Sequence, residues 1–102
     1  MYIAMNRFLV NEGREDGFED TWEKRERHLD EVEGFVDFKL LRGDTADGKT
    51  AYVSHSSWAS KAAFVAWTQG EAFRKAHSDA RSPEGTLAGP PRFDGYEVIL
   101  EA

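Results

Sequence analysis

The sequence predicts an α+β fold in which one antiparallel four-stranded sheet carries two helical regions on one face. Helical patterns run from Arg14 to about Glu31 and from Ser60 to about Asp79. Strand patterns flank and separate them, at residues 2–10, 35–41, 50–58 and 92–101. An Asp-Gly pair between the second and third strands predicts a hairpin, which gives the order β-α-β-β-α-β.

The first strand is apolar on both of its alternating faces. One face is Tyr2, Ala4, Asn6, Phe8 and Val10, and the other is Ile3, Met5, Arg7 and Leu9. A strand with one face in water would alternate apolar and polar residues, so both faces are expected to be covered. Because both helices are expected on one face, Ile3, Met5 and Leu9 would be exposed in a monomer. We therefore predict a symmetric homodimer packed sheet against sheet.

The first helix is predicted from a single apolar stripe on an otherwise charged segment. The stripe consists of Phe18, Trp22, Leu29 and Val32. The charge run at residues 23–27 fits the solvated face of this helix. Gly34 stops the helix, and Ser60 is placed to cap the next one. Gly70 divides the second helical region into two short helices, since a glycine in a helix interior costs about 1 kcal/mol relative to alanine.

Composition limits the functional classes. The 102 residues, 40% hydrophobic and 13% aromatic, predict one globular domain over residues 1–102, and no apolar run approaches the roughly 20 residues that span a bilayer. The amino terminus lacks an export pattern, so a cytoplasmic location is expected. A net charge of −6 argues against nucleic acid as a partner. Without cysteine there is no disulfide, thiolate ligand or thiol nucleophile, and the histidine spacing does not fit a structural zinc site.

The second helical region holds the candidate ligand-binding side chains. Phe64, Trp67 and Phe73 are followed by His77. On one unbroken helix, Trp67 and His77 would be about 80° apart around the axis and roughly 15 Å apart along it, and a bend at Gly70 would bring them closer. Both side chains would then reach one flat ligand. Taken alone, the three aromatic residues also fit a core face, and His77 also fits a cation favoured by a helix C-terminus.

Three stretches carry a family resemblance that covers nearly the whole chain. They are Met5-Asn6-Arg7, Glu33-Gly34-Phe35, and Trp58-x-Ser60-Lys61-x-Ala63-Phe64-x-x-Trp67 leading to Phe73-x-x-Ala76-His77. In these residues the chain resembles the IsdG-type haem-degrading monooxygenases of the antibiotic biosynthesis monooxygenase superfamily. The resemblance implies a ferredoxin-like fold that pairs into a dimeric α+β barrel. Relatives that oxidise quinols without a cofactor share this framework, and the combination of Asn6, Trp67 and His77 is what points to haem.

The resemblance also implies roles for individual residues. His77 would be the axial ligand of the haem iron, Trp67 would press on the porphyrin, and Asn6 would donate a hydrogen bond on the distal side. Taken alone, Asn6 also fits a buried amide satisfied by backbone. Arg81 and Arg92 are candidate partners of the haem propionates, with solvated surface charges as the alternative. The predicted haem-binding set, which adds residues to the three implied by the resemblance, is Asn6, Phe64, Trp67, Phe73, His77 and Arg81.

The activity implied by the resemblance is opening of the porphyrin ring at a meso carbon, with release of iron and a bilin-type tetrapyrrole. Haem would then be both cofactor and substrate, with O2 and an external electron donor such as a partner reductase. Two alternatives stay open. One is a cofactor-independent oxygenase of quinol-like aromatic substrates, and the other is a haem-binding carrier that does no chemistry.

Overall fold

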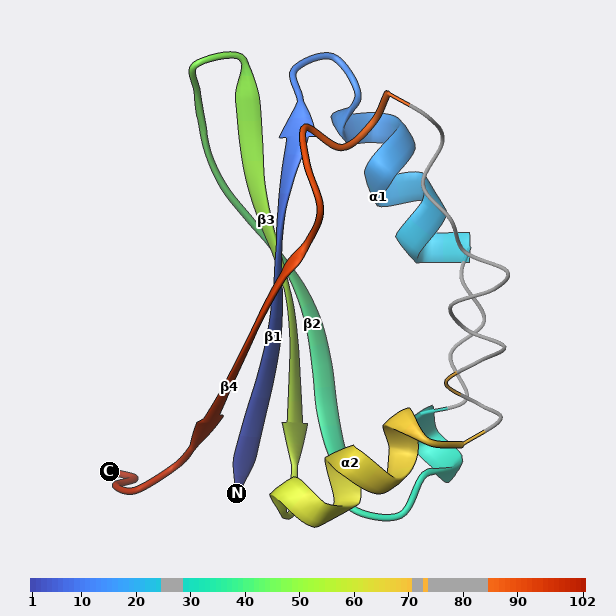
Figure 1. Ribbon diagram of the computed structural model, residues 1–102, viewed down its shortest axis with the longest axis vertical. Helices are drawn as coiled ribbons and strands as arrows, with labels where there is room; N and C mark the ends of the chain where they lie inside the picture. Colours follow the sequence, from blue (N-terminus) through green and yellow to red (C-terminus); the bar gives the residue numbers. More distant parts are fainter. Residues whose placement is uncertain (25–28, 71–72, 74–84) are drawn as a thin grey trace.

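The computed structural model describes residues 1–24, 29–70, 73 and 85–102. Its sheet is antiparallel with strand order β2-β3-β1-β4, and its strands are β1 (Tyr2–Asn11), β2 (Phe35–Ala46), β3 (Lys49–Trp58) and β4 (Arg92–Glu97). The helices are α1 (Glu15–Lys24) and α2 (Lys61–Thr68), with a 3-10 turn, η1, at Leu29–Glu31. Both helices lie on the same side of the sheet (Figure 1). The predicted fold class and element order are therefore confirmed.

Two hydrophobic clusters form the core between the helices and the sheet. The α1 cluster consists of buried Val10, Phe18 and Tyr52, with Phe8, Trp22, Leu40 and Leu87 packed against them. The α2 cluster consists of buried Tyr2, Ala4, Leu29 and Trp58, with Val32, Phe35, Phe38, Ala63, Phe64 and Trp67 packed against them. Since Tyr2, Ala4 and Val10 alternate along β1, the helix-covered face of this strand is the one predicted. The opposite face, with Leu9 46% exposed, is the open face of the sheet.

Local sequence signals explain the element boundaries. Gly34 has a φ of +83°, and a Cβ there would collide with the Ala63 Cβ, so only glycine fits this tight approach of the β2 start to α2. Ser60 caps α2, because its hydroxyl accepts a hydrogen bond from the Ala63 N–H at 3.1 Å. Asp47 and Gly48 both have positive φ, of 53° and 75°, as a two-residue hairpin turn requires.

Several predicted boundaries are corrected. The α-helix begins at Glu15 and the described part ends at Lys24, with residues 25–28 outside the described residues and η1 beyond them. The β2–β3 ladder continues past Arg42 through a register shift to Ala46, because the Asp-Gly turn itself needs only two residues. Residues 42–46 are mostly polar, so the alternation of hydrophobic residues did not predict this extension of the strand.

The last strand is shorter than predicted. It ends at Glu97, which pairs with Tyr2, the first residue of β1, so no ladder partner remains for the residues beyond it. One backbone bond continues the contact, from Val98 N–H to the Met1 carbonyl at 2.9 Å. Ile99 and Leu100, predicted to be in the strand, are 94% and 86% exposed. Within the described part of the chain, no helix has the length and apolar character needed to cross a membrane.

Candidate functional site

A row of paired residues crosses the helix-covered face between the two clusters. Leu40 of β2 pairs with Ser54 of β3, Ser54 pairs with Asn6 of β1, and Asn6 pairs with Phe93 of β4. Residues that pair across strands point to the same face, so these four side chains all face the helices. We call them the central row. On β1, Asn6 separates Ala4 of the α2 cluster from Phe8 of the α1 cluster.

Asn6 is half-buried and is the one amide of this row. Within residues 1–24, 29–70, 73 and 85–102, no hydrogen bond involves its side chain, and its polar atoms are not among the fully buried ones. The interpretation of Asn6 as a buried amide satisfied by neighbouring backbone is therefore not what the described residues show. An amide that is accessible and uncommitted can donate two hydrogen bonds and accept others from a ligand.

Aromatic rings on and beneath α2 form one side of this region. Trp67 lies 5.2 Å from Trp58 and 4.8 Å from Phe73, where the two planes are nearly perpendicular at 89°. Phe64 lies 6.0 Å from Trp67 and stacks on Phe93 at 5.6 Å with planes 9° apart. The structure thus brings together Phe64, Trp67 and Phe73, the three aromatic residues predicted from the sequence.

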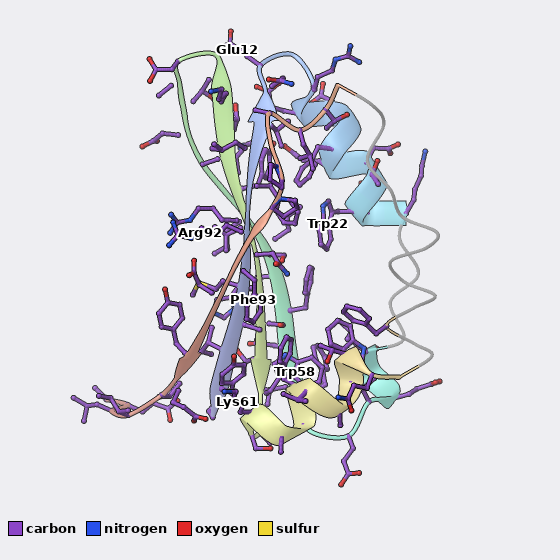
Figure 2. The ribbon with its side chains drawn as sticks, in the orientation of Figure 1. Glu12, Trp22, Trp58, Lys61, Arg92 and Phe93 are labelled. Atoms are coloured by element: carbon purple, nitrogen blue, oxygen red, sulfur yellow. The ribbon has the colours of Figure 1, made fainter. Side chains whose placement is uncertain are left out.

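A second pair of rings stands on the α1 side. Trp22 stacks on Phe38 with centroids 5.7 Å apart and planes at 18°, and it meets the edge of Phe8 at 5.7 Å. Figure 2 shows Trp22 projecting from α1 toward the sheet. From the sequence, Trp22 was assigned only to a core stripe and Phe38 was not singled out, because a helix-spaced aromatic residue fits a core and a ligand wall equally well.

An open pocket of about 440 Å³ lies at the β2 end of the central row. It is lined by Glu19, Trp22, Glu23, Leu40, Arg42 and Tyr52. The Tyr52 hydroxyl donates to Glu19 Oε2 at 2.5 Å, and Arg42 Nη1 donates to the same oxygen at 3.2 Å. Burial, and after it the bond to Glu19, raises the pKa of Tyr52 to about 12. This phenol therefore stays protonated at neutral pH and holds α1 to β3.

The chain's three histidines and the two candidate propionate partners, Arg81 and Arg92, separate into two groups. His28, His77 and Arg81 lie outside the described residues. His55 pairs with Met5 and Lys39, so it lies on the open face and cannot reach the central row. Arg92 also lies on the open face, away from the helices, and is 3.9 Å from Asp94 (Figure 2). Among the described residues, no three histidine, aspartate or glutamate side chains are grouped to hold a metal ion.

Comparisons with known proteins agree with this fold. A haem-degrading monooxygenase of Shouchella clausii is 28% identical over 97% of this chain and 92% of its own. A structure of the haem degrader MhuD from Mycobacterium tuberculosis, with two haems in its active site, has a TM-score of 0.77 and 26% identity, covering 100% of this chain and 99% of its own. SnoaB, a cofactor-independent oxygenase from Streptomyces nogalater, has a TM-score of 0.71 at 20% identity, covering 98% and 94%, which shows the fold alone.

The family itself is identified by a model described as antibiotic biosynthesis monooxygenase, which matches residues 1–79. This match includes β1, α1, β2, β3 and α2, and so most of the sheet and both described helices. A Bacillus cereus structure with a TM-score of 0.81 at 22% identity, covering 100% of this chain and 94% of its own, shares the same ferredoxin-like architecture. The chain therefore belongs to the antibiotic biosynthesis monooxygenase family.

Proposed function

We propose that the protein is a haem-degrading monooxygenase, which opens the porphyrin ring at a meso carbon and releases iron and a bilin-type tetrapyrrole. The observation that carries the proposal is the Asn6 amide. Among the described residues this amide is accessible and has no hydrogen-bond partner, and it lies on the helix-covered face of the sheet between two sets of aromatic rings. The similarity to the haem-degrading enzyme of Shouchella clausii and to MhuD supports the choice of haem as the ligand.

The described residues fit a flat, largely apolar macrocycle. Binding sites for such ligands are lined by aromatic and aliphatic side chains with a few polar groups that fix orientation. Here the rings are Trp22 and Phe38 on the α1 side and Phe64, Trp67 and Phe73 on the α2 side. Asn6 supplies the polar group between them. The proposed iron ligand, His77, and the proposed propionate partner, Arg81, belong to the part of the chain outside the described residues.

In this proposal the side chains of the protein contribute to the reaction by positioning the haem. Haem, when bound, supplies the oxidative chemistry with O2 and electrons from an external donor. Asn6 would donate a hydrogen bond on the distal side of the haem, and an amide can do this without giving up a proton. Trp67 is held by Trp58 on one side and by Phe73 on another, and an indole fixed in this way would press on the bound macrocycle. A fixed ring that presses on the macrocycle supplies distortion, one of the means by which proteins tune haem.

A homodimer is part of the proposal. The open face carries Ile3, Met5 and Leu9 on β1, and Tyr96, which pairs with Ile3, is 53% exposed. A second copy of the chain packed on this face would cover these side chains while leaving the helix-covered face free for ligand. We expect this dimer to act in the cytoplasm with a partner reductase as electron donor.

The second candidate function is cofactor-independent oxidation of a quinol-like aromatic. An anthrone oxidase-like protein is 28% identical over 97% of this chain, although the match covers only 44% of that protein. A flat tricyclic substrate would fit between the same aromatic rings, with Asn6 bonding its oxygen. The third candidate, a haem carrier without chemistry, predicts the same binding site and differs only in turnover.

Haem titration followed by the Soret band tests the proposal. The wild-type protein should bind haem, and His77→Ala should shift or abolish the band. His55→Ala is the matched control and should leave the band unchanged, because His55 lies on the opposite face of the sheet from Asn6. Absence of haem binding by the wild-type protein would favour the quinol oxygenase. Stable haem binding without turnover under air and reductant would identify a carrier.

A further inference from the structure

Phe93 stands in the central row, although it lies beyond residues 1–79, which the family model matches. It pairs with Asn6, so its side chain is on the helix-covered face, and yet 47% of it is exposed. Figure 2 labels Phe93 near the middle of the sheet. A large apolar ring, 47% exposed, therefore lies next to the accessible Asn6 amide, where it can contact a flat ligand.

The orientation of this ring is fixed by its neighbours. Phe64 stacks on it at 5.6 Å with planes 9° apart, and Phe64 is in turn held by Tyr2 at 5.5 Å. Gly95 leaves the space that the ring occupies along β4, since Phe93 Cε1 is 3.3 Å from the position that a Gly95 Cβ would take. The Tyr2 hydroxyl occupies the same space above Gly95. A ring with stacked neighbours and one open side is preorganised for contact.

We propose that Phe93 is a specificity-determining contact residue that forms the β4 wall of the site. It fixes how far a flat ligand extends toward β4 and thereby which edge of the ligand lies over Asn6. This inference rests on the proposed function, because the ligand in question is haem. The four meso carbons are equivalent about the centre of the macrocycle, so its in-plane rotation would determine which of them lies beside Asn6. Contact of the ligand edge with Phe93 would restrict this rotation and thereby the tetrapyrrole isomer that forms.

Substitutions at Phe93 test the proposal. Phe93→Ala removes the wall and should weaken haem binding about tenfold. This corresponds to a loss of about 1.4 kcal/mol in binding free energy. It should also change the ratio of tetrapyrrole isomers, measured by chromatography of the products. Phe93→Tyr keeps the ring and should restore both properties, and Phe93→Leu should be intermediate. A ring with a purely structural role would lower the melting temperature without moving the isomer ratio.

Val65→Ala is the matched control. Val65 is 39% exposed on α2 and lies outside the central row and both core clusters. Its truncation removes a similarly exposed apolar side chain and should alter haem affinity less than twofold. If Phe93→Ala does not fold, the comparison of Phe93→Leu with Phe93→Tyr decides the question by the same two measurements.

The outcomes separate this inference from the proposed function. If the wild type binds haem, and Phe93→Ala or Phe93→Leu retains wild-type affinity and isomer ratio, the assignment of Phe93 is wrong while the proposed function stands. If the wild type binds no haem, the proposed function fails, and anthrone is the probe. A raised KM for anthrone in Phe93→Ala with unchanged kcat then supports the β4 wall. The Phe93 assignment is overturned if the wild type neither binds haem nor oxidises anthrone. It is also overturned if Phe93→Ala leaves the KM for anthrone unchanged.

Discussion

The indole rings of Trp58 and Trp67 lie 5.2 Å apart at an angle of 33°, and Trp58 is completely buried while Trp67 is half-buried. Trp67 therefore packs against the α2 cluster through Trp58, and Phe73 lies 4.8 Å from it as well. Its contacts agree with the interpretation of the helical aromatic residues as a core face, and a ligand contact remains the proposed second role. A substitution at Trp67 must accordingly be judged on folding and on chemistry separately.

Trp67→Ala should lower the free energy of unfolding by about 2–4 kcal/mol, somewhat less than the 3–5 kcal/mol typical of a fully buried aromatic side chain. Trp67→Phe should cost about half as much, because a smaller ring still contacts Trp58. Under the proposed mechanism both variants open haem more slowly, in the order wild type, Trp67→Phe, Trp67→Ala. Denaturant unfolding and the rate of haem loss, measured on folded variants, check this. Equal rates for all three proteins would count against ring distortion.

The two glycines at positions 17 and 34 should respond in opposite ways to alanine. Gly34→Ala forces a side chain into a φ of +83° and against Ala63, and we expect a loss of at least about 2 kcal/mol. Gly17 lies inside α1 with open space at the position that a Cβ would take, so Gly17→Ala should gain about 0.5–1 kcal/mol. Thermal unfolding of the two variants measures both changes in stability. A neutral Gly34→Ala would show that β2 and α2 are not so closely packed.

Tyr52 should make the protein lose stability at alkaline pH. Its folded-state pKa, about 12, is raised above the ordinary value of 10. The contribution to the unfolding free energy is therefore fully present below pH 10 and is lost as the pH rises through about 12. Tyr52→Phe should abolish this loss and should cost about 1–3 kcal/mol at pH 7 through the missing bond to Glu19. Urea unfolding of the wild type and of Tyr52→Phe at several pH values checks this, and an equal alkaline loss in both proteins would contradict it.

Leu9→Lys tests the predicted dimer. Leu9 is 46% exposed on the open face and pairs with Ala51, so a lysine there is solvated in an isolated protomer but buried without a partner in a sheet-to-sheet dimer. We expect a folded monomer by light scattering at micromolar concentration. Val65→Lys, on α2, should leave the dimer intact. A wild-type protein that is monomeric at this concentration would refute the proposed assembly directly.

The sequence predicted the elements whose signals are local. The alternation along β1, the turn at Asp47 and Gly48 and the cap at Ser60 are each set by a few neighbouring residues, and each is confirmed. Strand ends were less predictable, because they depend on partners: β4 stops where β1 has no further residue to pair with.

The candidate site was predictable in part for the same reason. Phe64 and Trp67 share one short helix, so their proximity follows from helical spacing. Phe93 joins Asn6 only through the register of β1 with β4, and Phe38 meets Trp22 only through the packing of α1 on β2. The residue pattern of a single segment cannot predict these two contacts, because each joins separate strands or a helix and a strand. The open-face position of His55 likewise became clear only from its pairing with Met5.

Aerobic incubation of the purified protein with haem and ascorbate, followed by the Soret band and by product analysis, tests whether the protein opens haem. The wild type should lose the Soret band and release iron and an opened tetrapyrrole. Asn6→Ala should bind haem within about tenfold of the wild type yet react at least about tenfold more slowly. Asn11→Ala, which removes an amide bonded to the Gly85 carbonyl at the far end of β1, should react at the wild-type rate. A persistent Soret band in the wild type, or equal rates for Asn6→Ala and Asn11→Ala, would contradict the account.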